Sequence, residues 1–190
     1  MFVITADQHD SRISDDLVPS ALDQVTEIAG SALALPPART AGDEIQALIR
    51  DAGPALAVAL SLTRNGEWSV GIGIGEVEDP LTDDVRAARG SAFIAARDAV
   101  EQAKSSPSRL AISDPDAEAL VRLLIELRDR RTKEGWEAYD LLAQGMTQRD
   151  AAAELGISEG AVSRRVSAAG IRTEEAALPA LAKVLDAAQG

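Results

Sequence analysis

Apolar residues recur along the chain at two spacings, which predict where strands and helices lie. Short β-branched runs predict strands, whereas longer runs with apolar residues three and four positions apart predict helices. In the first 114 residues the predicted strands are 1–6, 45–49, 68–75 and 109–112, and the predicted helices are 17–33, 54–65 and 91–104. A turn at Gly42 and Asp43 adds a hairpin partner for the second of these strands. The order strand, helix, strand, strand, helix, strand, helix, strand predicts an α+β fold of ferredoxin-like type with an extra terminal strand.

The segment 68–75 has an unusual composition for a strand. Glycine and apolar residues alternate along it, with Gly71, Gly73 and Gly75 on one face and Val70, Ile72 and Ile74 on the other. One face of the predicted strand therefore lacks side chains, so that a helix or a ligand can lie close to its backbone.

Beyond residue 114 the pattern is helical throughout. Asp114, Pro115 and Asp116 mark a boundary, so we predict one domain at 1–114 and a second, all-α domain at 115–190. Helices are expected at 117–131, 136–144 and 174–188, with two shorter helices inside 147–169. Pro179 fits the last helix only in its first or second turn, because proline lacks the N–H that a helix interior needs.

Residues 147–169 carry the signals of two short helices joined by a tight turn. Thr147 is a typical N-cap residue, and Asp150 three positions later completes a capping box. Gly156 tolerates the positive φ that ends the first helix, and Ser158 is the N-cap of the second. These signals predict a helix-turn-helix, and an ordinary helical hairpin is the alternative.

The second short helix has an apolar side and a polar side. Val162 and Val166 face the first helix, which leaves small polar residues and Arg164 pointing outward. In DNA-binding proteins of this type the second helix enters the major groove and the start of the first touches the backbone. The candidate DNA-binding residues are Thr147, Gln148, Arg149, Ser158, Glu159, Gly160, Ser163, Arg164 and Arg165. Among them Arg164 is the base-reading candidate, whereas Arg149 and Arg165 are expected to hold phosphates.

The charge of the chain limits what such an interface can do. The sequence has 31 Asp and Glu against 19 Lys and Arg, for a net charge of -12. Because the molecule as a whole repels phosphate, DNA contact needs a local basic face, and dimerisation would double the contacts. We therefore expect DNA and a second copy of the chain as partners.

The remaining composition excludes several classes of protein. A hydrophobic fraction of 46% is enough for a packed core, and the lack of cysteine excludes disulfides and thiolate metal sites. Met1 leads directly into FVITAD, without a basic segment or a long apolar run. We therefore expect no signal peptide, no membrane span and a cytoplasmic protein.

Several blocks of the sequence, taken in order, resemble a known family. The segments ITADQHDSR, RTAGDEIQAL, WSVGIGIG and ARGSAFIAARDAV are followed by the predicted helix-turn-helix. This succession resembles the SatD family of small bacterial proteins over nearly the whole chain. The family has no settled biochemical activity, so the resemblance implies no particular reaction.

The N-terminal blocks also resemble, more distantly, the class III nucleotide cyclase fold. In that fold a strand ends in a metal-binding Asp, a second Asp follows Gly at a hairpin turn, a strand reads IGIG and a helix carries AAR. The resemblance places metal-binding carboxylates at Asp7 and Asp43, and nucleotide-binding residues at Arg39, Gly42, Asp43 and Arg97. Two carboxylates at adjacent strand ends can hold Mg²⁺ ions that bridge nucleotide phosphates.

Two departures from the cyclase pattern argue against cyclase activity. Cyclases of this class have an Asn four residues before the Arg of the AAR sequence, where this chain has Phe93. Arg39 stands where a Lys is usual, and its planar guanidinium is not the same point charge. We therefore expect a domain of cyclase-like shape without a competent cyclase site. A nucleotide or metal site used for sensing is a hypothesis that rests on Asp7 and Asp43.

The sequence favours a sequence-specific DNA-binding regulator whose N-terminal domain dimerises or senses a ligand. The first alternative is an enzyme that binds or converts a nucleotide with Mg²⁺ at Asp7 and Asp43, and it is less favoured because the catalytic constellation is incomplete. The second is an adaptor whose helix-turn-helix docks another protein. The sequence implies no cofactor apart from that Mg²⁺ and nucleotide.

Overall fold

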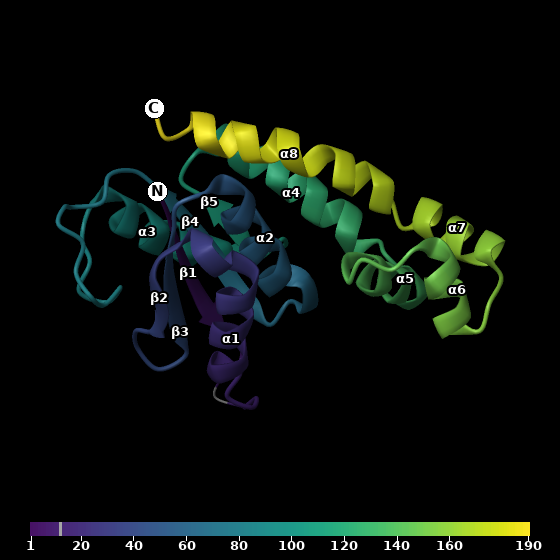
Figure 1. Ribbon diagram of the computed structural model, residues 1–190. Helices are drawn as coiled ribbons and strands as arrows, with labels where there is room; N and C mark the ends of the chain where they lie inside the picture. The colour runs from purple at the N-terminus through teal and green to yellow at the C-terminus, as the bar shows by residue number, and fades with distance from the viewer. Residues whose placement is uncertain (12) are drawn as a thin grey trace. The chain divides into compact units, whose positions relative to one another are not determined.

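The computed structural model describes residues 1–11 and 13–190, which form two compact units (Figure 1). The first unit comprises Met1–Arg122 with Ala180–Gly190, and the second comprises Leu123–Pro179. Two helices, α4 (Pro115–Asp129) and α8 (Ile171–Ala187), contribute residues to both units. The division after residue 114 into separately folding domains stays a prediction.

A five-stranded sheet forms the centre of the first unit. Its strands are β1 (Phe2–Gln8), β2 (Leu33–Arg39), β3 (Glu44–Ile49), β4 (Trp68–Ile74) and β5 (Leu110–Ile112). They lie in the order β2-β3-β1-β4-β5, with antiparallel pairing except between β4 and β5, which are parallel. The first four strands have the ferredoxin-like order, and β5 is the extra terminal strand. The α+β prediction is therefore confirmed.

Helices cover both faces of this sheet. Helices α1 (Val18–Ala29) and α2 (Ala52–Leu62) pack against each other and against one face, and α3 (Ser91–Ser105) covers the other (Figure 1). The glycines of β4 let α3 lie directly on the strand. A Cβ atom at Gly71 would lie 2.3 Å from the backbone N of Val100, and one at Gly73 would lie 2.0 Å from the carbonyl O of Ala92. A helix, not a ligand, thus occupies the bare face of β4.

The helix predicted at 17–33 is shorter than expected. Helix α1 ends at Ala29, and Leu33–Arg39 forms the edge strand β2, although it contains Pro36 and Pro37. Both prolines fall where the pairing between β2 and β3 shifts, between the partners of Leu35 and Ala38. Because proline has no N–H to donate to a neighbouring strand, an edge or an irregularity is where a sheet accepts it.

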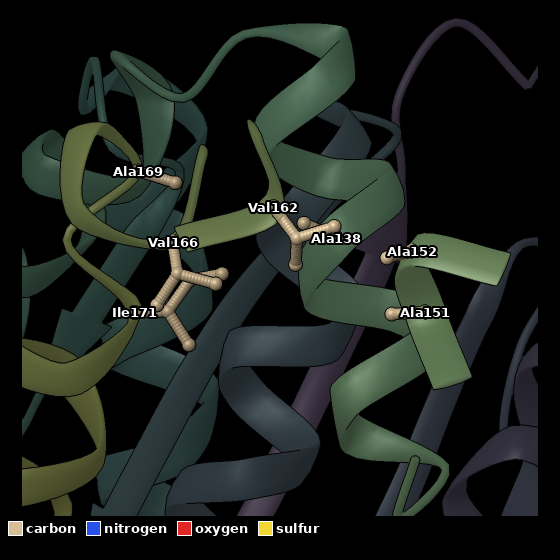
Figure 2. Packing of buried hydrophobic residues seen from close by; sticks show 7 residues of the cluster. All are labelled: Ala138, Ala151, Ala152, Val162, Val166, Ala169 and Ile171. Atoms are coloured by element: carbon tan, nitrogen blue, oxygen red, sulfur yellow. The ribbon is translucent and has the colours of Figure 1, made fainter. Parts of the chain in front are cut away.

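Three short helices of the second unit pack around small apolar side chains. They are α5 (Lys133–Ala143), α6 (Gln148–Leu155) and α7 (Glu159–Ala168). Figure 2 shows the side chains that meet between them and the start of α8: Ala138, Ala151, Ala152, Val162, Val166, Ala169 and Ile171. Because most of these side chains are small, the helices can approach closely. The inward side predicted for Val162 and Val166 is therefore confirmed.

The last helix begins earlier than predicted. Helix α8 starts at Ile171, three residues before the expected start at 174, so that Pro179 lies in its third turn. The expectation that Pro179 falls in the first or second turn is therefore wrong. Gly170, in the left-handed conformation with φ 64°, separates α8 from α7 and allows the earlier start.

Candidate functional site

Helices α6 and α7 are joined and capped by the side chains that the sequence predicts. The hydroxyl of Thr147 accepts a hydrogen bond from the backbone N–H of Asp150 at 3.2 Å, and the carboxylate of Asp150 accepts one from the backbone N–H of Thr147 at 3.2 Å. The Thr147 hydroxyl also donates to this carboxylate at 2.7 Å, and these bonds lower the pKa of Asp150. Gly156 then turns the chain with φ 65°, and the hydroxyl of Ser158 accepts from the backbone N–H of Ala161.

Helix α7 presents a polar face to solvent. Its apolar side is buried, with 0% of Val162 and 4% of Val166 exposed. The exposed residues on the other side are Ser158, Glu159, Gly160, Ser163, Arg164 and Ser167. At the start of α6, Thr147 and Arg149 are exposed and Gln148 is half-buried. The structure therefore brings the predicted DNA-contacting residues of α7 to one accessible helix face.

The two arginines of α7 differ in how firmly they are held. Nη1 of Arg165 lies 3.0 Å from Oε2 of Glu137 in α5, and the Arg165 side chain is 25% exposed. Arg164 is exposed, and its Nη1 lies 3.8 Å from where a Cβ at Gly160 would be, so its side chain runs toward the start of α7. In the part of the chain that the structure describes, no carboxylate lies within salt-bridge distance of Arg164. The guanidinium of Arg164 is thus available to a ligand.

A buried charge network lies beside this helix pair. Arg128 and Arg131 both donate hydrogen bonds to the carboxylate of Glu174, the latter from Nη2 at 2.6 Å. Nε of Arg131 donates to the carbonyl O of Ala169 at 3.0 Å, and its guanidinium lies 4.4 Å from the centre of the Trp136 ring. The network therefore connects Ala169, the residue after α7, to Arg131 and through it to Glu174 in α8.

A second candidate site lies at the end of β1 in the first unit. A pocket of about 490 Å³ is lined by the predicted carboxylates Asp7 and Asp43, together with Lys104 and Arg109. Nζ of Lys104 lies 3.3 Å from Oδ2 of Asp7, and the hydroxyl of Ser11 donates a hydrogen bond to Asp43. Burial raises the pKa of Asp7, and the positive charge of Lys104 partly opposes this shift. The pocket therefore offers both anionic and cationic groups to a ligand.

A metal ion at this pocket would need ligands beyond the two carboxylates. Within residues 1–11 and 13–190, no group of three or more His, Asp or Glu side chains is arranged to hold a metal ion. Mg²⁺ often binds one or two carboxylates and takes its other ligands from phosphates and water. Because Asp7 and Asp43 supply only two carboxylates, they fit such an ion only alongside a phosphate-bearing ligand.

The remaining predicted nucleotide contacts do not line this pocket together with the carboxylates. Nη2 of Arg39 donates to Oδ1 of Asp16 at 2.6 Å, so Arg39 is held in an exposed ion pair. Arg97 lines a separate pocket of about 590 Å³ beside the first half of α3. Gly42, with φ 58°, lies in the turn between β2 and β3. The structure thus brings Asp7 and Asp43 to one pocket and places Arg39 and Arg97 outside it.

No pattern in the sequence indicated the two basic residues, Lys104 and Arg109, of the pocket at Asp7 and Asp43. Lys104 is in the last turn of α3, and Arg109 follows that helix with a left-handed φ of 49°. The one available signal was the length of the amphipathic helix. Helix α3 begins beside the C-terminal end of β4 and runs back along that strand, so its last turn lies near the start of β4. Neither residue carried a motif of its own.

No protein-family model matches the chain, and no curated protein matches it. One similar solved structure is a regulator of polyketide synthase expression from Bifidobacterium adolescentis, with 17% identity over 97% of this chain and 78% of that chain. Its TM-score of 0.31 is too low to support any argument about fold or function. Membership of the SatD family stays a prediction.

Among the residues that the structure describes, no helix combines the length and the apolar character needed to cross a membrane.

Proposed function

We propose that the chain is a sequence-specific DNA-binding regulator and that α6 and α7 form its helix-turn-helix. The observation that carries this proposal is the arrangement of α7, which is buried on its valine side and exposes serines, Gly160 and Arg164 on the other. Short side chains let a helix enter the major groove, and an arginine among them can donate two hydrogen bonds to a guanine. The capping box at the start of α6 supports the same geometry.

In this proposal α7 reads base edges and the start of α6 positions the protein on the DNA. Arg164 contacts a base, with Ser158, Glu159, Gly160 and Ser163 beside it. Thr147, Gln148 and Arg149 contact phosphates, since the first N–H groups of a helix attract anions. The helix-turn-helix of one copy has few basic groups, and the net charge of the chain is -12. We therefore propose that a dimer binds two half-sites.

Selection from a library of randomised DNA duplexes tests this function. The purified full-length chain is incubated with the library at low salt and again near physiological salt, and the retained DNA is sequenced. Enrichment of one recurring site at both salt concentrations supports the regulator. No enrichment at either concentration contradicts it and favours a helix pair that docks another protein.

A pair of variants links the result to α7. Changing both Arg164 and Arg165 to Ala should abolish retention of the selected site while the helical circular dichroism spectrum stays unchanged. Changing Lys183, an exposed residue of α8 in the first unit, to Ala removes a positive charge elsewhere and should leave retention intact. Normal retention by the double variant would contradict the role of α7.

The pocket at Asp7 and Asp43 supports a second, smaller proposal, that the first unit senses a ligand with a phosphate group. Lys104 and Arg109 supply positive charge there, and the two carboxylates can hold Mg²⁺ next to the phosphate. Asp43→Asn should then weaken Mg²⁺-dependent binding of a fluorescent ATP analogue by the full chain. Binding that is unchanged in this variant, or equal without Mg²⁺, would contradict the site. Turnover of the analogue would favour the enzyme alternative.

A further inference from the structure

The second unit contains a pocket in which two predicted DNA contacts lie beside an arginine that was not predicted to contact DNA. Its volume is about 270 Å³, and it is lined by arginines and by residues with small side chains. The lining residues are Arg130, Thr132, Gly135, Arg164, Arg165, Ala168 and Ala169. They come from the turn after α4, the start of α5 and the second half of α7 with the residue that follows it. Two of these segments, the turn after α4 and the second half of α7, thus contribute arginines to one hollow.

The positive charge of this pocket is only partly compensated. Arg165 is paired with Glu137. Hydrogen bonds with its own backbone and with Thr132 lower the pKa of Glu134, and the positive charge of Arg165 adds a smaller contribution. By contrast, Arg130 is exposed, and no carboxylate among residues 1–11 and 13–190 lies within salt-bridge distance of it. The pair with Glu137 uses Nη1 of Arg165 and holds its side chain in place, so the remaining N–H groups are pre-oriented. The pocket is thus lined by one arginine that is held in an ion pair and by one that is exposed.

The floor of the pocket suits a compact anion. Gly135, Ala168 and Ala169 contribute little side-chain bulk, and a Cβ at Gly135 would lie 2.8 Å from Cγ of Arg131 and 3.0 Å from Cβ of Ala169. This close packing keeps α5 and the end of α7 together, so the pocket has a rigid base. Planar guanidinium groups bind phosphate oxygens with two parallel hydrogen bonds. The chemistry of the pocket thus matches a phosphate group.

Arg164 connects the pocket to the exposed face of α7. It contributes to the pocket lining, while its Nη1 lies near Gly160 toward the start of the helix. A DNA strand with a phosphate in the pocket would therefore run along the polar face of α7. The start of α6, with Thr147 and Arg149, offers a separate contact for the other side of the groove. Contacts on both sides of the major groove would set the depth and the angle at which α7 lies in it.

We propose that Arg130 and Arg165 clamp a phosphate of the DNA backbone in this pocket and thereby position α7 in the major groove. This inference rests on the proposed DNA-binding function. It adds Arg130 as a positioning residue, and it separates the phosphate clamp from Arg164, which reads a base. A phosphate contact carries no sequence information, so its loss weakens binding to every sequence alike.

Salt-dependent DNA binding by the full chain tests the clamp. Arg130→Ala should weaken binding to the selected site and to a scrambled duplex by the same factor, roughly threefold or more, and lower the slope of log K against log salt by about one. Arg130→Lys should retain part of the affinity, and Glu134→Gln should increase it, since a nearby negative charge is removed. Lys183→Ala, outside the second unit, is the control and should change neither affinity nor slope.

The outcomes separate the clamp from the DNA-binding function itself. If the unmodified chain binds the selected site and Arg130→Ala changes neither affinity nor slope, the clamp is wrong and the function stands. If Arg130→Ala alters only the preferred base at one position, Arg130 reads sequence and the clamp is equally wrong. If the unmodified chain binds no DNA, both fail. Titration with inorganic phosphate, followed by NMR at the Gly135 amide, then shows whether the pocket serves a small phosphorylated ligand instead.

Discussion

Oε2 of Glu174 accepts a hydrogen bond from Nη2 of Arg131 at 2.6 Å, and the two side chains are 1% and 0% exposed. Arg128 binds the other oxygen, so this one carboxylate joins two buried guanidinium groups. The aromatic faces of Trp136 and Tyr139 lie next to both guanidinium groups and stabilise their positive charge. The second unit therefore depends on Glu174 more than on any surface ion pair.

Replacing Glu174 by Gln should destabilise the chain strongly. The change removes the carboxylate that both buried guanidinium groups bind, and breaking a buried ion pair costs about 3–5 kcal/mol in comparable cases. Urea denaturation followed by circular dichroism measures the loss. Glu175→Gln is the matched control, since Glu175 forms an exposed pair with Arg172 that should contribute less than about 1 kcal/mol. Equal stability of the two variants would contradict the importance of the buried network.

Gly73→Ala should also be destabilising, for a steric reason. The new Cβ would lie 2.0 Å from the carbonyl O of Ala92 and 2.3 Å from the backbone N of Ala96, both in α3. The helix would therefore have to move away from the sheet. Overpacking of this kind costs about 3 kcal/mol. Gly53→Ala is the control, because a Cβ there meets nothing within 4 Å and alanine is favoured in the first turn of α2. Thermal unfolding should separate the two variants clearly.

The capping box makes a prediction that joins stability to titration. Thr147→Ala removes the hydroxyl that binds Asp150, so the unfolding free energy should fall by about 1 kcal/mol and the pKa of Asp150 should rise toward its usual value. A lowered folded-state pKa stabilises the fold above the unfolded-state pKa, and this contribution is lost as the pH falls. Thr147→Ser keeps the hydroxyl and should preserve both quantities. NMR titration of the Asp150 carboxyl carbon gives the pKa directly.

Lys104→Met should raise the pKa of Asp7 further. Burial already raises this pKa, and Lys104 is the neighbour that lowers it most. With a raised folded-state pKa, Asp7 stabilises the fold below its unfolded-state pKa, and this contribution is lost as the pH rises through the folded-state value. In the variant, the stabilising contribution of Asp7 should therefore be lost at a higher pH than in the unmodified chain. An unchanged Asp7 pKa, measured by carboxyl NMR, would show that the ion pair with Lys104 does not form.

The fold was predictable where local chemistry decides it and not where tertiary contacts decide it. Thr147, Gly156 and Ser158 carry their own capping and turn signals, and each lies where the sequence predicts. The alternation of glycines in β4 likewise predicted a close approach. The strand at Pro36 and Pro37 was missed because prolines favour extended backbone but are rare in sheets, and only the pairing with β3 makes this segment a strand.

The candidate sites show the same division. Asp7 and Asp43 line one pocket because β1 pairs with β3 so that Asp7 lies opposite Glu44, the residue after Asp43. The resemblance to the cyclase fold was enough to associate them. Lys104 and Arg130 lie at the ends of helices whose directions depend on packing, and no spacing in the sequence relates them to their pockets. Basic residues from separate elements can be grouped only once the fold is known.

The two free edges of the sheet restrict how copies of this chain can associate. At one edge, β2 has two prolines and an interrupted pairing pattern, and at the other, β5 has three residues. Neither edge offers the continuous row of N–H and C=O groups that an added strand requires. A dimer that shares one continuous sheet is therefore disfavoured, and so is growth into fibrils by strand addition. Two copies that bind adjacent half-sites on DNA would have to meet through helices or loops.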